Sequence, residues 1–343
     1  MRTSISSIIL LAFCALSVIS CDKISSEDIT SSNETSWEKD PNLYYLSDIS
    51  ADSCPTQTDT LVFYDVTATT ADFAGLNAAL RFISAYTSRE LHLSFPLLEK
   101  FPEFAIFGES AYDYYFTPTS FTSLSAAVAT EVGQCAFYSC ESLHTVDLPN
   151  VTTIHDAAFN WCTAVTNFNL PRLTKLGYNA ISYCTSLTEL SLPRLTYVNN
   201  RGIFFNSALT SLETPLVNEI EDFAYAKNSV MTTLSLPKVT EVPKWTFTSC
   251  SKLAYLELPK ATTFENYCFE SCSSLVTLKI ASENNAKLKS IGEYAFDGVT
   301  TTKIALTLSI SNAEYVDGNT LTIGENSWTF LSITLEGETI TVS

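Results

Sequence analysis

Ten cysteines are the side chains of this 343-residue sequence with the most chemical potential, because thiolates bind metal ions and thiols form disulfides. Five of them recur at one position of an internal repeat: Cys140, Cys162, Cys184, Cys250 and Cys272. Members of this set are 22 residues or more apart, whereas zinc-binding cysteines usually come in closely spaced pairs. The spacing therefore favours buried thiols over a metal site.

The same repeat position also holds Asn206 and Asn228, so it accepts side chains that hydrogen-bond a turn of the backbone. A thiol can make the same bond weakly, and we expect a column of free thiols. Cysteines in stacked coils would lie about 5 Å apart, but parallel Cβ directions disfavour a bridge between them. Cys54 and Cys135 lie outside the column and are the better candidates for a disulfide, and Cys268 stands where other repeats have a small residue.

The sequence has few residues or motifs that could form a catalytic site. It contains only three histidines, His92, His144 and His155, and no motif sets a nucleophile beside them. No glycine-rich phosphate loop occurs. The strongest enzymatic alternative is a polysaccharide lyase or hydrolase on a parallel β-helix, which would need clustered carboxylates that the outward positions of the repeat do not supply. The sequence predicts no enzyme, no cofactor and no bound metal.

A strict period explains how these residues are positioned. Six prolines follow one another at intervals of 22 residues: Pro149, Pro171, Pro193, Pro215, Pro237 and Pro259. A period of 20 to 30 residues marks a solenoid, in which each coil buries its apolar face against its neighbours. A solenoid displays a long surface, so binding is a stronger hypothesis than catalysis.

Each coil has an apolar pattern that predicts a short strand. Leu143, Val146 and Leu148 have the L-x-x-L-x-L spacing of a leucine-rich repeat, and Pro149 then turns the chain because it cannot donate a ladder hydrogen bond. Stacked strands of this kind form a parallel sheet. Ile154 and its equivalents in the other coils should cover the back of the sheet. Within each coil a small residue comes next, and then an aromatic or branched residue such as Phe159.

The full pattern Ile-x-x-x-Ala-Phe-x-x-Cys-x-Ser-Leu, followed by a strand and Leu-Pro, resembles the BspA-like leucine-rich repeats of Bacteroides-type surface lipoproteins. Tandem instances cover about residues 120–296. The resemblance implies an α/β solenoid, a right-handed leucine-rich-repeat superhelix with a parallel sheet, 22-residue coils and an irregular or short helical back. It also implies a cell-surface, adhesin-like protein that binds host matrix proteins or other bacteria, and it transfers no catalytic residue.

The N-terminal residues have the features of a bacterial lipoprotein. Residues 1–20 form a short basic end and an apolar stretch, and Val18-Ile19-Ser20-Cys21 resembles a lipobox in which Cys21 becomes the acylated anchor. A plain signal peptide with another cleavage site is the alternative. Residues 21–55 are polar and acidic, which predicts a flexible tether. The expected location is the outer membrane, with the solenoid at the cell surface.

The ends of the repeat array must cover its exposed core. We expect an N-terminal cap with a degenerate repeat at 56–119, repeats at 120–305 and a β-rich C-terminal cap at 306–343. In the first cap, Phe73, Leu76, Leu80 and Ile83 share a helical face, and Leu91, Leu93 and Phe95 alternate as a strand.

Two surfaces are candidates for ligand binding. The outward strand positions are small, polar and mildly acidic, and they include Tyr255 and Glu257. The residues three positions after the back column form another set, whose aromatic members could hold carbohydrate rings or partner side chains: Arg201, Phe223, Trp245, Tyr267 and Tyr294. The alternative for this set is half-buried packing.

Three functions follow from these surfaces. The first is a monomeric adhesin for a protein ligand on host or neighbouring bacteria, the second a glycan-binding component of a polysaccharide capture system, and the third a structural protein of the cell envelope. The formal net charge of −18 argues against nucleic acid as a partner. Membrane contact would come through the lipid on Cys21.

Overall fold

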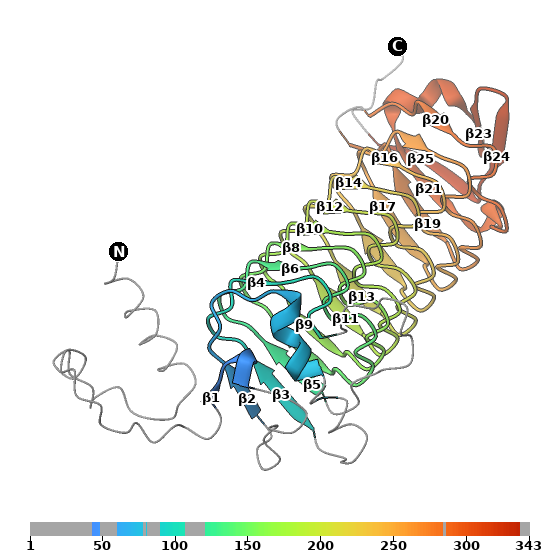
Figure 1. Cartoon of the computed structure of the whole chain (residues 1–343). Coiled ribbons are helices and arrows are strands. Elements are labelled where there is room, and N and C mark those ends of the chain that lie inside the picture. The colour runs from blue at the N-terminus through green and yellow to red at the C-terminus, as the bar shows by residue number, and fades with distance from the viewer. Residues whose placement is uncertain are drawn as a thin grey trace, which may run out of the picture.

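The computed structural model is an elongated stack of coils with a cap at each end (Figure 1). It describes residues 43–48, 60–77, 80, 90–106, 121–283 and 286–336. Cys21, Cys54, Ile83 and the predicted signal peptide lie outside the described residues. Among the described helices, none is long and apolar enough to cross a membrane.

A parallel sheet, here called the front sheet, receives one strand from each coil. Its ladder is interrupted twice, which divides it into segments β1 to β9, β11 with β13, and β15 to β25. Paired residues such as Thr145 and Asn167 are 22 positions apart, so adjacent coils stack in register. The strands of the front sheet are β1 (Leu43–Tyr44), β2 (Thr60–Phe63), β3 (Leu91–Ser94), β5 (Phe121–Ser125), β7 (Thr145–Asp147), β9 (Asn167–Asn169), β11 (Glu189–Ser191), β13 (Ser211–Glu213), β15 (Thr233–Ser235), β17 (Tyr255–Leu258), β19 (Thr277–Ile280), β21 (Ala305–Ser309) and β25 (Ser332–Glu336).

A second, narrower parallel sheet forms the back of the stack. Each of its strands has two residues, an outward one followed by an inward one such as Ile154. The sequence predicted the inward column but not the sheet. The strands are β4 (Lys100–Phe101), β6 (Glu131–Val132), β8 (Thr153–Ile154), β10 (Lys175–Leu176), β12 (Tyr197–Val198), β14 (Glu219–Ile220), β16 (Glu241–Val242), β18 (Thr263–Phe264) and β20 (Ser290–Ile291).

An irregular turn segment joins the back sheet to the front sheet in each coil. Residues 121–283 contain no helix, so of the two expected forms of the back the irregular one is present. Two residues per turn have positive φ, for example Phe223 (59°) and Lys227 (61°). This conformation is unfavourable for side chains other than glycine. The N–H groups of Phe223 and Lys227 donate to Lys244 O and Thr248 O of the next coil at 3.2 and 2.8 Å, which holds the turn in place.

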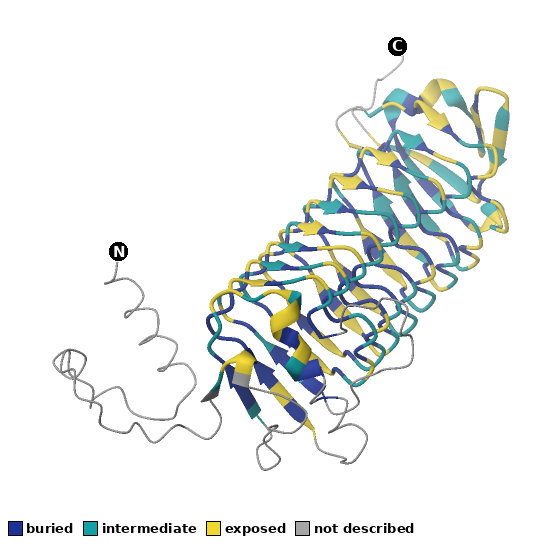
Figure 2. Ribbon diagram, in the orientation of Figure 1, coloured by how far each residue is buried: buried dark blue, intermediate teal, exposed yellow. Residues whose placement is uncertain are grey.

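One continuous core fills the space between the sheets. Leu143, Leu148, Val151 and Ile154 are fully buried and Val146 is 2 % exposed, which confirms the predicted register. Figure 2 shows buried and exposed residues alternating along the front strands. The interior is therefore a layered apolar column, and the outward strand positions form the surface.

The N-terminal cap begins earlier than expected. β1 and the 3₁₀ helix η2 (Leu46–Asp48) fall within the predicted tether of 21–55, yet β1 pairs with β2 and Leu46 is 1 % exposed. The predicted tether was therefore too long at this end, because Leu46 joins the core and Tyr44 packs against it. The predicted helical face is confirmed at Phe73, Leu76 and Leu80, all fully buried, in η3 (Thr70–Phe73) and the helical residues after it.

The C-terminal cap is rich in strands, as expected. β21 and β25 extend the front sheet, while an antiparallel sheet of β22 (Val316–Asp317), β23 (Thr320–Ile323) and β24 (Asn326–Thr329) lies beside it, with 3₁₀ helices η4 (Thr301–Lys303) and η5 (Ile310–Tyr315). Leu321 is fully buried and Phe330 is 2 % exposed. These side chains cover the end of the core. The handedness of the superhelix stays a prediction.

Candidate functional site

The front sheet presents two rows of outward side chains. In β7, β9, β11, β13 and β15 the central residue is buried and both of its neighbours are exposed. Side chains in one row bond along the stack: Asn169 Nδ2 donates to Asp147 Oδ1 at 2.6 Å, and Ser191 Oγ donates to Glu213 Oε2 at 2.9 Å. The predicted polar, mildly acidic face is therefore flat, solvated and open.

The candidate pair Tyr255 and Glu257 lies on this face. Tyr255 is 37 % exposed. Glu257 Oε1 lies 3.5 Å from Lys279 Nζ, which is also 3.4 Å from Glu336 Oε2, and Ser235 donates to Glu257 at 3.3 Å. Burial and the neighbouring Glu257 carboxylate raise the pKa of the Tyr255 phenol, so it is uncharged at neutral pH. Glu257 is thus largely engaged within the chain, while Tyr255 offers ring surface.

The aromatic candidates form a continuous stack, here called the C-terminal strip: Arg201, Phe223, Trp245, Tyr267 and Tyr294. Ring centroids are 5.0 Å apart for Phe223 and Trp245, 5.6 Å for Trp245 and Tyr267, and 5.3 Å for Tyr267 and Tyr294, with interplanar angles of 6°, 2° and 8°. The guanidinium of Arg201 lies 5.0 Å from the Phe223 centroid. The structure therefore brings all five predicted residues together.

The orientation of these rings decides what they can offer to a ligand. Parallel rings at this separation cover each other's faces, so the inner members expose edges and not faces. Tyr294 differs, because it is 44 % exposed and has one ring neighbour, Tyr267, among the described residues. The open ring face of this strip is at its C-terminal end.

A second aromatic stack, here called the N-terminal strip, was not predicted. Trp161 and Tyr183 stack at 4.5 Å and 5°, Tyr183 and Phe205 at 4.9 Å and 29°, and Lys227 Nζ lies 5.8 Å from the Phe205 centroid. Trp161 is 41 % exposed. The signal was present in the sequence, because these residues recur every 22 positions directly before the Cys/Asn column.

Phe204 joins the two strips. Its ring is 5.6 Å from the Tyr183 ring, and the cationic groups of Arg201 and Lys227 each lie 5.5 Å from its centroid. Each strip is therefore closed by a cation at its inner end and has a more exposed ring, Trp161 or Tyr294, at its outer end. Because a cation attracts the electron-rich face of a ring, both strips are stabilised along the stack axis.

The thiol column is buried and free of disulfides, as expected. Cys162 Sγ donates to Phe137 O at 3.1 Å and Cys272 Sγ to Phe247 O at 3.1 Å; Asn206 Nδ2 makes the equivalent bond to Ile181 O at 3.0 Å. The predicted turn-bonding role of this position is confirmed. Burial raises the pKa of Cys184 and of Cys250 to about 12, so these thiols stay protonated and unreactive near neutral pH.

The two cysteines outside the column have separate outcomes. Cys135 is a free, half-buried thiol, and burial followed by the charges of Asp156 and Glu103 raises its pKa to about 11. Its suggested partner Cys54 lies outside the described residues. Cys268 is fully buried in the small-residue column, as predicted.

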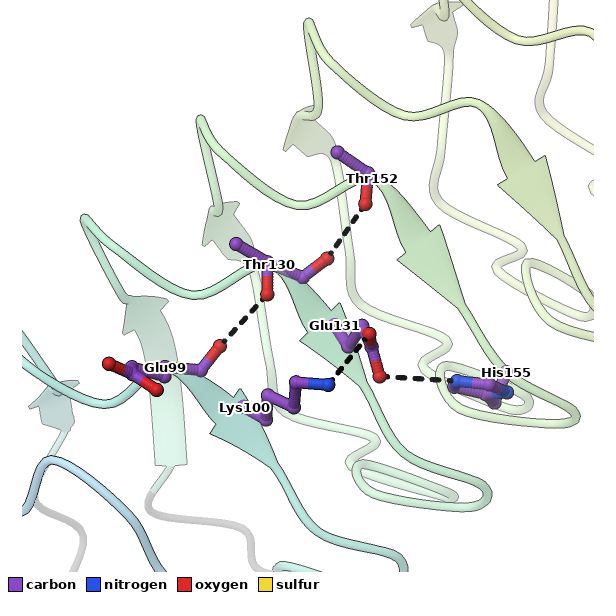
Figure 3. A network of polar contacts seen from close by, with 6 residues as sticks. All are labelled: Glu99, Lys100, Thr130, Glu131, Thr152 and His155. Carbon is purple, nitrogen blue, oxygen red and sulfur yellow. Dashed lines mark hydrogen bonds and ion pairs between the residues drawn. The ribbon is translucent and has the colours of Figure 1, made fainter.

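The histidines do not form a catalytic group. His155 Nε2 lies 3.9 Å from Glu131 Oε2, and Lys100 Nζ lies 2.8 Å from Glu131 Oε1 (Figure 3). The hydrogen bond from Lys100 holds the pKa of Glu131 below its ordinary value, so this carboxylate is ionised at neutral pH. Thr152 Oγ1 donates to Thr130 O at 3.2 Å beside this group (Figure 3). These are links between coils at an exposed corner.

No metal-binding cluster of three His, Cys, Asp or Glu side chains occurs within the described ranges. His92 Nδ1 hydrogen-bonds Ser123 Oγ at 2.5 Å in the front sheet, and His144 is exposed. The arrangement of described side chains supports binding chemistry on two surfaces, the front sheet and the outer ends of the strips.

Comparison with protein families identifies the repeat. The family model described as the BspA type leucine rich repeat region matches six copies over residues 109–228 and 200–316. The chain belongs to this family. The prediction from the repeated Ala-Phe, Cys and Leu-Pro positions is thereby confirmed. No curated protein matches the chain in sequence.

Three bacterial proteins of solved structure are similar to the chain. A leucine rich cell surface protein from Faecalibacterium prausnitzii is 22 % identical over 64 % of this chain and 70 % of its own, with a TM-score of 0.46. The leucine-rich repeat protein of T. pallidum is 17 % identical over 64 % and 85 %, with a TM-score of 0.38. A leucine-rich repeat protein from Bacteroides ovatus is 18 % identical over 68 % and 82 %, with a TM-score of 0.37.

Proposed function

We propose that this chain is a surface lipoprotein that binds a protein ligand non-covalently through its front sheet, as an adhesin does, and that it is not an enzyme. The observation that carries the proposal is the front sheet itself, whose outward positions are exposed from β7 to β15. A flat row of short polar side chains fits a protein surface. Membership of the BspA-type family and the name of the Faecalibacterium protein support a role at the cell surface.

Residues 1–20 and Cys21 supply the proposed attachment. A diacylated and amide-acylated cysteine anchors a protein stably, where one acyl chain would be marginal. We expect Cys21→Ser to leave the protein soluble or unprocessed, as measured by membrane fractionation. Full retention of the variant in membranes would place the anchor elsewhere.

The binding test compares the two sheets. The chain is applied to an array of matrix proteins, bacterial surface proteins and polysaccharides, and a saturable protein ligand is expected. A front-sheet variant with Asn167→Arg, Glu189→Arg and Thr233→Arg should lose that ligand, because bulky cations cover the flat face. The back-sheet variant Glu219→Arg with Glu241→Arg makes the same change in net charge at exposed positions of β14 and β16 and should bind normally.

Glycan capture is the second candidate, and one observation favours it. The rings of Trp161 and Tyr294 are the most exposed in their strips, at 41 % and 44 %, and pyranose rings pack on open aromatic faces. In this case a polysaccharide should raise the melting temperature of the chain, and Tyr294→Ala should abolish the rise. Glycan capture would be excluded if no polysaccharide changed the melting temperature and if the chain bound a protein ligand equally well with and without Tyr294→Ala.

A further inference from the structure

A groove opens in the front sheet between β13 and β15. These strands belong to different ladder segments, whereas β11 pairs with β13 and β15 pairs with β17. The groove has a volume of about 490 Å³, and its lining includes Leu212, Glu213, Leu234, Ser235 and Tyr255. It interrupts the otherwise flat face that we propose as the binding surface.

The floor of the groove is apolar. Leu212 is 9 % exposed and Leu234 3 %, whereas the inward residues Leu256 and Leu278 of the following strands are fully buried. Among the inward residues at the centre of strands β7 to β19 of the front sheet, Leu212 is the most exposed. Part of its surface is therefore left for a partner side chain to cover.

The walls of the groove carry one acidic group and one ring. Glu213 accepts a hydrogen bond from Ser191, and no cation of the described residues lies within ion-pair distance of it. Glu257, two front strands further along in β17, differs because Lys279 already pairs with it. The Tyr255 ring, 37 % exposed, stands on the far side of the groove.

This combination suits a long cationic side chain. Lysine and arginine place an aliphatic stem on apolar surface and keep the charged head near polar groups, and both are attracted to the face of a tyrosine. The net charge of −18 favours a basic partner in general. A sugar would need several hydrogen-bonding groups around it, and the floor here is leucine.

We propose that the groove between β13 and β15 receives an arginine or lysine side chain of a basic protein partner, with its stem on Leu212 and Leu234, its charge at Glu213 and its side against Tyr255. This inference rests on the proposed function, since it names the partner chemistry of the same front sheet.

The test uses the full chain and a small probe. Acetyl-arginine amide is titrated while backbone amide shifts are recorded by NMR, with acetyl-norleucine amide and maltotriose as parallel probes. Saturable shifts should cluster at residues 211–213 and 233–235 with the arginine probe. Glu213→Gln should raise its Kd at least fivefold, and the groove-filling variant Ser235→Phe, which keeps the charge, should abolish the local shifts.

Glu241→Gln is the matched control, because it removes the same charge from an exposed position of the back sheet. It should change the Kd by less than twofold, and all variants should keep the melting temperature of the parent. Shifts scattered over the acidic surface, equal effects of Glu213→Gln and Glu241→Gln, or saturation of the groove by maltotriose would each overturn the inference.

The experiments distinguish a wrong groove assignment from a wrong binding surface. If the groove ignores the arginine probe while the triple front-sheet variant still loses its protein ligand, only the groove assignment falls. If the triple variant keeps its ligand, the proposed function itself is wrong.

Discussion

The front sheet and the aromatic strips are built by the same 22-residue period, but the period has opposite consequences for them. On the front sheet, short side chains such as Asn169 and Ser191 bond their neighbours sideways and leave their outer surface in water. In the strips, rings separated by 4.5 to 5.6 Å, as in Trp161 with Tyr183 and Trp245 with Tyr267, cover each other. A repeated small polar residue leaves an open surface, whereas a repeated aromatic residue makes a stack whose rings cover one another.

Strand register decides which side chains of each coil face the core, and a core variant should give the largest loss of stability. Phe247 is fully buried between Tyr225 and Phe269, at 5.9 and 6.0 Å. Phe247→Ala should lower the free energy of unfolding by about 3–5 kcal/mol, because the stacked coils cannot collapse into the cavity. Ser191→Ala should change it by less than ~1 kcal/mol. Equal losses in thermal unfolding would mean that the register, and with it the assignment of the exposed face, is off by one residue.

The turn segments that carry the strips depend on the Cys/Asn column. Asn206 donates to Ile181 O at 3.0 Å, and its Oδ1 accepts from the backbone N–H of Cys184 at 2.9 Å. Asn206→Ala leaves both buried backbone groups unpaired and should cost about 2–4 kcal/mol. Asn206→Cys should cost less, because the thiol can still donate to Ile181 O. Denaturation midpoints that rank Asn206→Cys below Asn206→Ala would contradict this role.

The rate of thiol alkylation reports how far the column cysteines are shielded from solvent. Burial keeps the pKa of the column thiols far above neutrality, so at pH 8 an alkylating reagent should leave all five nearly unlabelled. Cys135 is half-buried with a pKa of about 11, and its labelling should be faster and should rise steeply as the pH approaches that value, because the thiolate is the reactive form. Mass spectrometry reports each site; a bridge between two column thiols would refute the arrangement.

Much of the fold could be predicted because each coil repeats the same pattern of residue types, so that every position can be compared across several copies. Val146 and Leu148 were predicted as apolar strand positions from the L-x-x-L-x-L spacing, and they are 2 % and 0 % exposed. The ends were harder, because each cap occurs once and has no second copy for comparison. Leu43 to Leu46 were assigned to the tether for that reason, although β1 pairs with β2.

The candidate surfaces could be predicted in composition but not in geometry. The columns showed that Trp245 and Tyr267 are neighbours, yet ring orientation depends on the positive φ of each turn, 56° and 64° here, which residue types alone do not reveal. The groove depends on the break in the ladder between β13 and β15, and residues 211–213 and 233–235 have ordinary strand composition.

We infer that the strips stabilise the stack of coils and that the front sheet is the surface available to a ligand, and a comparison of melting temperatures distinguishes the two roles. Trp245→Ala with Tyr267→Ala removes three stacked contacts, each worth about 0.5–1.5 kcal/mol, in addition to buried ring area. The front-sheet variant Thr233→Ala with Ser235→Ala removes only exposed side chains. We expect the melting temperature of the strip variant to be many degrees below that of the parent, and that of the front-sheet variant to equal it. If the strip variant has the melting temperature of the parent, the rings do not stabilise the fold. That result would contradict a structural role and favour a role in ligand binding.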